Sequence, residues 1–441
     1  MRLVLPAALL HPLGGCLYKG TLSVVVYPWH RPLQDVYGEM EHGTLRQRHP
    51  RGDLRGHAAG VLPCLKNDQK MKYYIIAGEA SGDMHAANLM AAIKRKDPKA
   101  EFRAWGGDRM KRQGATLVKH YRHTAFMGFL EVAFNIHKVL GNITECKKDL
   151  KAYQPDVVIL VDYPGFNLRM AKFAHQNKMK VCYYISPQLW AWKRHRVYKI
   201  KRYVDKMLVI LPFEESFYHD YGVNTVFVGH PLLDELAKLE TTPRSSFVHR
   251  NNLSEKKEII ALLPGSRKQE VERMLETMLK VIPHFPEYQF VIAGVSSLDK
   301  NLYIKRMGNT DVRWVENQTY ELLQSSSAAL VTSGTATLET ALLAVPEVVC
   351  YKASQLSYLI AKSLIKVRFI SLVNLVMDKE VVKELIQNDC NEENLTRELG
   401  LLLKDPKRQR KMLEDLDILK DRLGNVGASE KAADAVLSMI K

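Results

Sequence analysis

The stretch Leu262-Leu263-Pro264-Gly265-Ser266-Arg267 ends an apolar, strand-like run and leads directly into a helix-like run. A strand that turns into a helix through Gly and Ser leaves backbone N–H groups pointing at open space, and these groups bind phosphate with the help of the helix dipole. Arg267 adds a planar guanidinium that suits phosphate oxygens. The stretch therefore predicts a phosphate-binding turn made by Gly265, Ser266 and Arg267. Such turns are common, so this one alone does not decide the function.

A second turn of the same kind lies downstream, where Ser333, Gly334 and Thr335 follow another apolar run. Glu339 comes about one helical turn later. By analogy with the acidic residue of dinucleotide sites, a carboxylate there accepts hydrogen bonds from the hydroxyls of a ribose. A diphosphate on one turn and a ribose on the other describe a site for a nucleotide sugar.

From Met71 onward, strand-like runs alternate with helix-like runs. The strand-like runs are 72–78, 156–162, 180–186, 207–211, 225–229, 258–263, 289–294, 312–315, 328–332 and 347–351. This alternation predicts an α/β fold with parallel sheets covered on both faces. A polar stretch at 241–257 separates the runs into two groups. We therefore expect two Rossmann-like, doubly wound domains, 71–245 and 246–441, that face one cleft, with ligands beyond the carboxyl ends of the strands.

Residues 1–70 show no sustained period of helix or strand and mix His, Arg, Gly and Pro in a manner typical of unfolded sequence. We interpret them as a disordered N-terminal extension, with Met71 as the natural start. Removing them is expected to leave activity and melting temperature unchanged.

The formal net charge of +16 favours an anionic partner, which includes nucleic acid, an acidic membrane surface and a phosphorylated substrate. No apolar run approaches the roughly 20 residues that span a bilayer, so we expect any membrane contact to lie at the surface. The 6 cysteines contain no CxxC pair, so neither a zinc site nor a disulfide framework is implied.

Asp162 follows the apolar run 157–161 and is therefore expected on the ligand edge of a sheet. Burial there raises the pKa of a carboxyl and makes it a better proton acceptor. The alternative is an aspartate that caps the turn at Pro164. In the turn 78–83, we expect Asp83 to cap the following helix and Glu79 to face the cleft.

His230 also follows a strand-like run. It could act as an acid or base, or it could be a hydrogen-bonded structural histidine. The segment 190–202 mixes Trp with Lys and Arg, which suits single-stranded nucleic acid, an anionic membrane surface or a solvated helix face. The segment 124–134 is apolar on all sides, which suits a buried helix or a patch that dips into a bilayer.

Several motifs, in this order along the chain, resemble the lipid-A-disaccharide synthase family. The most specific are Ala77-Gly78-Glu79-Ala80-Ser81-Gly82-Asp83 and Trp190-Ala191-Trp192. The others are 127–132, 211–214, 229–230, 262–267 and 333–339. The resemblance runs from about Met71 to the C-terminus and leaves out residues 1–70.

The resemblance implies an inverting glycosyltransferase of the GT-B arrangement. Such an enzyme joins UDP-2,3-diacylglucosamine to 2,3-diacylglucosamine 1-phosphate, with no metal or other cofactor, and releases UDP. It implies that Asp162 is the base, that Arg267 contacts the donor and that Glu79 and Ser81 are needed for activity. It also implies a functional role for Asn374, which we place with the residues that bind the UDP-sugar.

Because both substrates carry acyl chains, we expect peripheral attachment to the inner face of the cytoplasmic membrane of a Gram-negative-type bacterium. The residues expected to contact membrane or acyl chains are Phe126, Met127, Phe129, Leu130, Lys193, Arg194 and Arg196. The resemblance further implies a homodimer, a last helix that packs back on the N-terminal domain, and no nucleic-acid partner. The rival interpretations are another UDP-sugar enzyme of the GT-B type, a UDP-sugar epimerase, and a basic RNA-binding protein.

Overall fold

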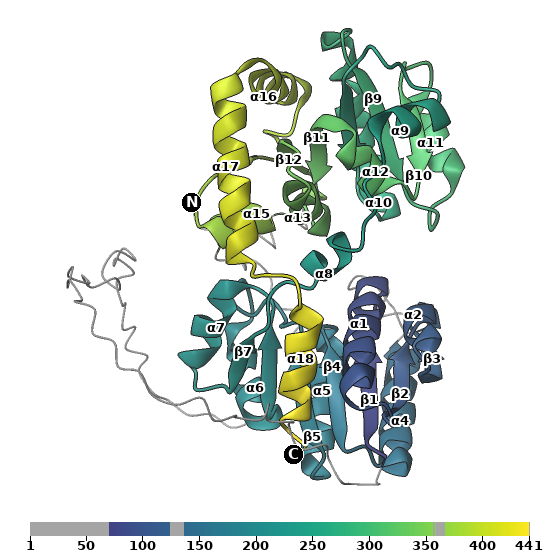
Figure 1. Ribbon diagram of the computed structural model, residues 1–441, viewed down its shortest axis with the longest axis vertical. Coiled ribbons are helices and arrows are strands. Elements are labelled where there is room, and N and C mark those ends of the chain that lie inside the picture. The colour runs from purple at the N-terminus through teal and green to yellow at the C-terminus, as the bar shows by residue number, and fades with distance from the viewer. Residues whose placement is uncertain (1–69, 124–135, 356–357, 359–366, 441) are drawn as a thin grey trace, which may run out of the picture. The chain divides into compact units, whose positions relative to one another are not determined.

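The computed structural model describes residues 70–123, 136–355, 358 and 367–440. The extension 1–70 predicted to be disordered therefore lies, except for Lys70, outside the described residues. Within them, the N-terminal half forms a parallel sheet of 7 strands in the order β3-β2-β1-β4-β5-β6-β7 (Figure 1). Its strands are β1 (Lys72–Ala77), β2 (Glu101–Gly106), β3 (Thr116–His120), β4 (Val157–Val161), β5 (Lys180–Tyr184), β6 (Lys206–Val209) and β7 (Thr225–Phe227).

The C-terminal half forms a second parallel sheet, for which the described residues supply 6 strands in the order β10-β9-β8-β11-β12-β13. These strands are β8 (Ile259–Leu263), β9 (Gln289–Gly294), β10 (Arg313–Glu316), β11 (Ser326–Thr332), β12 (Glu347–Tyr351) and β13 (Lys383–Ile386). In both sheets the chain first winds outward from the central strand in one direction and then returns to wind in the other. The α/β, doubly wound GT-B prediction is confirmed.

Helices cover both sheets. Around the first sheet lie α1 (Ala80–Lys96), α2 (Asp108–Arg112), α4 (Ile136–Tyr153), α5 (Pro164–Gln176), α6 (Val197–Tyr203) and α7 (Pro212–His219). The connection to the second sheet carries α8 (Leu232–Leu236) and α9 (Arg244–Arg250). The second half adds α10 (Lys268–Leu279), α11 (Lys300–Met307), α12 (Thr319–Gln324), α13 (Thr335–Leu342), α15 (Leu372–Met377), α16 (Glu392–Lys404), α17 (Pro406–Arg422) and α18 (Ala428–Leu437).

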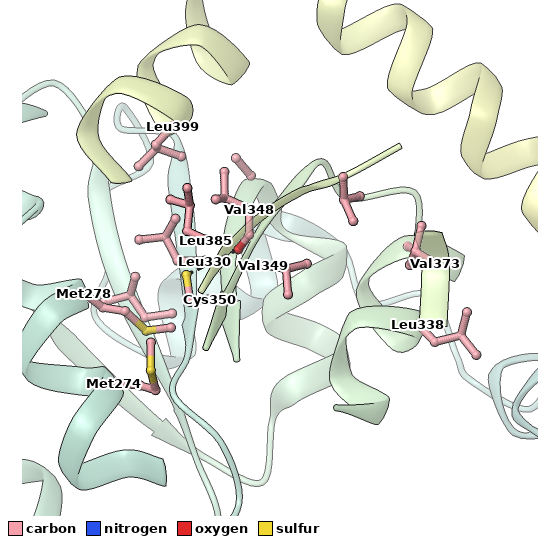
Figure 2. Close-up of a cluster of buried hydrophobic side chains, with 14 of the residues drawn as sticks. Met274, Met278, Leu330, Leu338, Val348, Val349, Cys350, Val373, Leu385 and Leu399 are labelled. Atoms are coloured by element: carbon pink, nitrogen blue, oxygen red, sulfur yellow. Dashed lines mark hydrogen bonds between the residues drawn. The ribbon is translucent and has the colours of Figure 1, made fainter. Parts of the chain in front are cut away.

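The central strands are buried along their whole length, because a parallel sheet covered on both faces leaves no exposed side for polar residues. Every residue of β4 and of β8 is buried. Figure 2 shows how the core of the second half is filled from several helices: Met274 and Met278 come from α10, Leu338 from α13 and Leu399 from α16. These contacts fix where the strands end, and therefore where the turns that follow them lie.

The last helix, α18, packs beside α1 of the first sheet (Figure 1). Three ion pairs join the helices: Arg95 pairs with Glu430, and Lys96 pairs with both Glu430 at 3.4 Å and Asp434 at 2.6 Å. The chain enters α18 through a glycine, Gly427, and Asp234 of α8 accepts hydrogen bonds from the backbone N–H groups at 427–429. Asp234 thereby fastens the start of α18 to the connection between the sheets.

Three strands were not expected from the sequence: β2, β3 and β13. Each carries charged or polar residues, as in Glu101-Phe102-Arg103 of β2. Such strands lie toward the sheet edges, where polar side chains reach solvent, so they lack the continuous apolar run of β4 or β8. Because β2 was not expected, the turn that follows it was not expected to contribute to the candidate site.

Candidate functional site

The turns predicted to carry function lie at the points where the strand order of each sheet reverses. In the first sheet, 78–83 follows β1 and Asp162 follows β4, and these strands are neighbours. In the second sheet, 265–267 follows β8 and 333–335 follows β11, which are also neighbours. Ligands of doubly wound sheets bind at this switch point, outside the carboxyl ends of the strands. Four turns that are far apart in the sequence thus occupy the two positions where this fold binds ligands.

Asp162 has the environment expected of a proton acceptor. Burial raises the pKa of its carboxyl to about 6, and the nearby charge of Glu79 acts in the same direction, while a backbone hydrogen bond from Tyr163 opposes the shift. Its backbone is left-handed, with φ of 44°, a conformation uncommon outside glycine. Its carbonyl oxygen accepts hydrogen bonds from Tyr183 Oη at 2.6 Å and Asn167 Nδ2 at 2.7 Å. These bonds hold the backbone of Asp162 in this unusual conformation.

Glu79 and Ser81 stand at the start of α1. Glu79 has extended backbone in the N-cap position, and its side chain makes no capping hydrogen bond. Ser81 is exposed. Gly78 precedes them beneath the Tyr163 ring, where an added Cβ would lie only 2.3 Å from Tyr163 Cγ. A larger residue at Gly78 would therefore displace the ring of Tyr163, the neighbour of Asp162.

Asp83 is a capping residue, but it caps a different helix from the one expected. Its carboxylate accepts hydrogen bonds from the backbone N–H groups of Gly107 at 2.7 Å, Arg109 at 3.0 Å and Met110 at 3.2 Å. These groups belong to the first turn of α2, which follows β2. The expectation that Asp83 caps its own helix is wrong, because β2 brings the start of α2 alongside α1.

The turn at Gly265 differs from the sequence prediction in one respect. Its N–H groups do not point at open space: those of Ser266 and Arg267 donate to Glu270 Oε2 at 3.1 Å and 3.2 Å. The Arg267 side chain remains 59% exposed, with Nη1 3.3 Å from Glu270 Oε1. Gly265 has φ of 111°, and a Cβ there would come within 2.5 Å of the Glu270 carboxylate. A carboxylate of the same helix thus occupies the position predicted for phosphate.

The turn at 333–335 is more open. Gly334 and Thr335 are exposed at the start of α13. Ser333 is anchored, because its N–H donates to the Cys350 carbonyl at 2.9 Å and its Oγ to the Ile370 carbonyl at 3.2 Å. Glu339, one turn further on, accepts a hydrogen bond from Tyr320 Oη at 3.1 Å, and burial raises the pKa of its carboxyl.

Asn374 is the predicted site residue that the structure corrects. It is fully buried, and its amide makes four internal hydrogen bonds. Nδ2 donates to the Val382 carbonyl at 2.8 Å and to Glu384 Oε1 at 2.9 Å, and Oδ1 accepts from the N–H groups of Val381 and Val382 at 2.8 Å and 3.0 Å. These bonds use the full capacity of an amide side chain. Asn374 therefore shapes the loop that precedes β13 and has no polar side-chain atom left for a ligand.

A cavity of about 690 Å³ lies beside the two switch points. It is lined by Ala80, Ser81, Met84, Arg109, Leu239, Glu240, Thr242, Val295, Asn317, Gln318, Thr319, Tyr320, Glu321, Gln324 and Glu339. Of the predicted site residues, Ser81 and Glu339 line it, whereas Asp162, Glu79 and Arg267 do not. Sequence reasoning missed Arg109, which lies in α2 just after the unrecognised strand β2, and Asn317, which directly follows the polar strand β10.

The aromatic residues of the basic segment are mostly part of the core. Trp190 is buried, and its Nε1 donates to Glu214 Oε1 at 3.1 Å. Trp192 lies beneath the Lys193 ammonium, 4.0 Å from the ring centroid. Arg194 is exposed and Arg196 half-buried. Trp190 is therefore no stacking platform for nucleic acid bases. The apolar residues Phe126, Met127, Phe129 and Leu130 lie outside the described residues.

His230 is held as a structural residue. It is buried, its Nδ1 accepts a hydrogen bond from the N–H of Leu232 at 3.3 Å, and burial lowers its pKa to about 3. Across the residues described, no group of three or more His, Cys, Asp or Glu side chains is arranged to hold a metal ion. In the same residues, no helix is both long and apolar enough to cross a bilayer.

Two doubly wound parallel sheets in one chain define the GT-B fold class. Solved structures agree. The chain is similar to UDP-GlcNAc 2-epimerase from Neisseria meningitidis bound to UDP-GlcNAc, with a TM-score of 0.59, 14% identity and coverage of 83% of this chain and 100% of that one. It is equally similar to the glycotransferase of kitacinnamycin, with a TM-score of 0.59, 11% identity and coverage of 85% and 100%. At these identities the likeness shows the fold alone.

Sequence relatives identify the family. The family model for lipid-A-disaccharide synthetase matches residues 73–438. The lipid-A-disaccharide synthase of Syntrophus aciditrophicus is 43% identical over 374 residues, which cover 83% of this chain and 97% of that protein. The synthase of Myxococcus xanthus is 38% identical over 372 residues, with coverage of 83% and 97%. The chain belongs to the lipid-A-disaccharide synthase family and is a glycosyltransferase, as the sequence motifs predicted. This membership favours that interpretation over an epimerase and over an RNA-binding protein.

Proposed function

We propose that this chain transfers the 2,3-diacylglucosamine unit of a UDP-sugar to the 6-hydroxyl of 2,3-diacylglucosamine 1-phosphate, with inversion, in lipid A biosynthesis. The observation that carries the proposal is the arrangement of the turns. A half-buried carboxyl, Asp162, stands at the switch point of one sheet, and Arg267 and Glu339 follow strands at the switch point of the other.

Inversion requires one in-line displacement. Asp162 accepts the proton of the acceptor 6-hydroxyl while the oxygen forms its bond to the anomeric carbon of the donor. The bond from that carbon to the diphosphate breaks, and its electron pair leaves with UDP. A pKa of about 6 keeps the Asp162 carboxyl ionised at neutral pH and still basic enough to accept the proton.

The departing diphosphate needs positive charge. Arg267 supplies it from an exposed side chain, and the exposed start of α13 at Gly334 and Thr335 supplies N–H groups and the helix dipole. Glu339 accepts the ribose hydroxyls. We further propose that no metal ion takes part, because these groups can meet the developing charge.

The test is incubation of the full chain with the two acylated glucosamine substrates, with the product read by mass spectrometry. We expect a tetraacyl disaccharide 1-phosphate and UDP, formed equally well with EDTA. Formation of an epimerised UDP-sugar would favour the rival reaction, and loss of product with EDTA would refute metal independence.

Since both substrates carry acyl chains, we also propose peripheral attachment to the inner face of the cytoplasmic membrane. The net charge of +16 and the cations Lys193, Arg194 and Arg196 support attraction to anionic lipid. Flotation with anionic liposomes tests this, and charge reversal at these three residues is expected to weaken binding. Equal flotation of both proteins would remove the segment from the role. Self-association as a homodimer is proposed from the family alone and is tested by light scattering.

A further inference from the structure

The cavity beside the switch points is poor in positive charge. Among the described residues that line it, Arg109 is the only Lys or Arg, whereas Glu240, Glu321 and Glu339 bring three carboxylates. The substrates of the proposed reaction carry a diphosphate in the donor and a phosphate in the acceptor. A phosphate in this cavity would be repelled by the carboxylates unless it lies against Arg109.

We propose that Arg109 binds a substrate phosphate in this cavity, either the donor diphosphate or the acceptor 1-phosphate. The inference rests on the proposed function and extends it to a residue outside the motifs that identified the family. Arginine suits this role because its planar guanidinium donates two parallel hydrogen bonds to phosphate oxygens.

The backbone of Arg109 is held in place by the adjoining motif. Asp83 accepts hydrogen bonds from the N–H groups of Gly107, Arg109 and Met110. Gly107 allows this approach, since a Cβ there would lie 2.3 Å from the Tyr121 ring and 2.8 Å from Asp83 Oδ2. The same helix α1 that carries Ser81 thus fixes the position of Arg109, and Asp83 is a positioning residue.

The side chain of Arg109 is available to a ligand. It is 51% exposed, and its nearest acidic partner, Glu235, lies 3.7 Å away, beyond hydrogen-bond distance. Glu235 is already engaged, because its Oε1 accepts from Asn88 Nδ2 at 2.6 Å and Lys238 Nζ at 2.8 Å. Within the described part of the chain, no hydrogen bond engages the guanidinium of Arg109. A weakly paired arginine at a cavity wall can bind an anion without first breaking a strong interaction.

The residues of the second half that line the cavity explain why two phosphates qualify. Glu339 and Tyr320 line it and share a hydrogen bond of 3.1 Å. A ribose held by Glu339 would bring its diphosphate into the same cavity. Arg109, in contrast, belongs to the half that carries Asp162, where the acceptor is expected. The chemistry is the same in both cases, and experiment distinguishes the sources.

The experiment compares Arg109→Gln with the wild-type full chain on ligand pairs that differ by a phosphate. Calorimetry compares UDP with uridine, and steady-state kinetics compare the acceptor with and without its 1-phosphate. We expect Arg109→Gln to weaken the phosphorylated member of one pair by about 10- to 100-fold and to leave its phosphate-free member unchanged. A loss in the UDP pair assigns Arg109 to the donor, and a loss in the acceptor pair assigns it to the acceptor.

Arg112→Gln is the matched control, because Arg112 is exposed on the same helix and does not line the cavity. It is expected to behave as wild type. Arg109→Lys keeps the positive charge but not the planar guanidinium, so it should retain part of the affinity for the phosphorylated ligand. A partial loss in this variant also separates a binding defect from a folding defect. Equal losses on both members of each pair, or no loss at all, would overturn the proposal. If the chain makes no disaccharide, the proposed function fails, and the comparison of UDP with uridine alone then decides the role of Arg109.

Discussion

Two strand-to-helix turns, one in each half, are built from the same residue types and use their acidic residue in different ways. Both follow the central strand of a sheet and contain Gly, Ser and an acid a few residues into the helix. In the first half, Asp83 reaches across to the backbone of α2. In the second, Glu270 folds back on the N–H groups of its own turn.

The difference shows what each turn is able to do. Asp83 is almost completely buried, and its bonds connect two elements of the first half, so that turn is a fixed frame for Ser81 and Arg109. Glu270 and Arg267 lie at the surface, with side chains that are 30% and 59% exposed. That turn can exchange its internal carboxylate for a ligand phosphate. Substitutions in each turn test this contrast between a fixed turn and an exchangeable one.

The largest expected effect is on the chemistry of the first half. Asp162→Asn removes the proposed base while keeping the side-chain shape, so kcat should fall by about 10²- to 10⁴-fold with little change in UDP affinity. Steady-state kinetics and calorimetry measure the two quantities. Turnover near the wild-type value would remove Asp162 from the role of base.

The pH profile is the second test of the same residue. Because the pKa of the Asp162 carboxyl is raised to about 6, the ionised form is lost below that pH. We expect kcat/KM to fall about tenfold per pH unit there, and the fall should vanish in Asp162→Asn. For stability, the raised pKa of the folded state means that the free energy of unfolding increases as the pH falls from about 6 toward the ordinary carboxyl value of 3.8. A profile without a step near pH 6 would contradict this assignment.

Breaking the fixed turn should mainly affect stability. Asp83→Ala leaves the N–H groups at the start of α2 without their acceptor, and we expect the free energy of unfolding to fall by about 2–3 kcal/mol. Denaturant unfolding followed by circular dichroism measures it. Asp108→Ala, at an exposed position of the same helix, is the control and should change little. Unchanged stability in Asp83→Ala would mean that the turn is not held by this carboxylate.

Substitution in the exchangeable turn should change UDP affinity more than stability. Arg267→Ala removes an exposed cation, so UDP affinity should fall by about five- to tenfold while the unfolding free energy stays nearly constant. Calorimetry with UDP and a thermal melt of the apo protein separate the two. If UDP binds Arg267→Ala with wild-type affinity, the turn does not contact the diphosphate.

The smallest effect is predicted for Glu270→Gln. Glutamine at this position still caps the turn but carries no negative charge. If the turn receives a diphosphate, removing the competing charge should tighten UDP binding by about two- to threefold at low salt. The gain should shrink as salt is added. Weaker binding would show that the Glu270 carboxylate supports Arg267 more than it repels the ligand.

The central strands of the sheets could be predicted well, because a strand buried on both faces requires a continuous apolar run. The runs that became β4 and β8 show this, and each predicted turn residue next to them lies at a strand end in the structure. The strands β2 and β13 could not be predicted, since they carry charged residues and lack a continuous apolar run like that of β4. Arg109 was missed together with β2, and Asn374 was misassigned because the sequence does not show that its amide is bonded to Val382 and to Glu384 of β13.

By itself, the sequence determined that the fold is α/β, which apolar runs form strands, and which residues follow them, because these depend on local patterns of hydrophobic and turn residues. The tertiary structure alone decided what the acids of the two turns bind, that Asn374 is enclosed, and that Arg109 reaches the cavity. Hydrogen bonds between segments distant in sequence depend on how the strands are ordered in space, and no local pattern encodes that order.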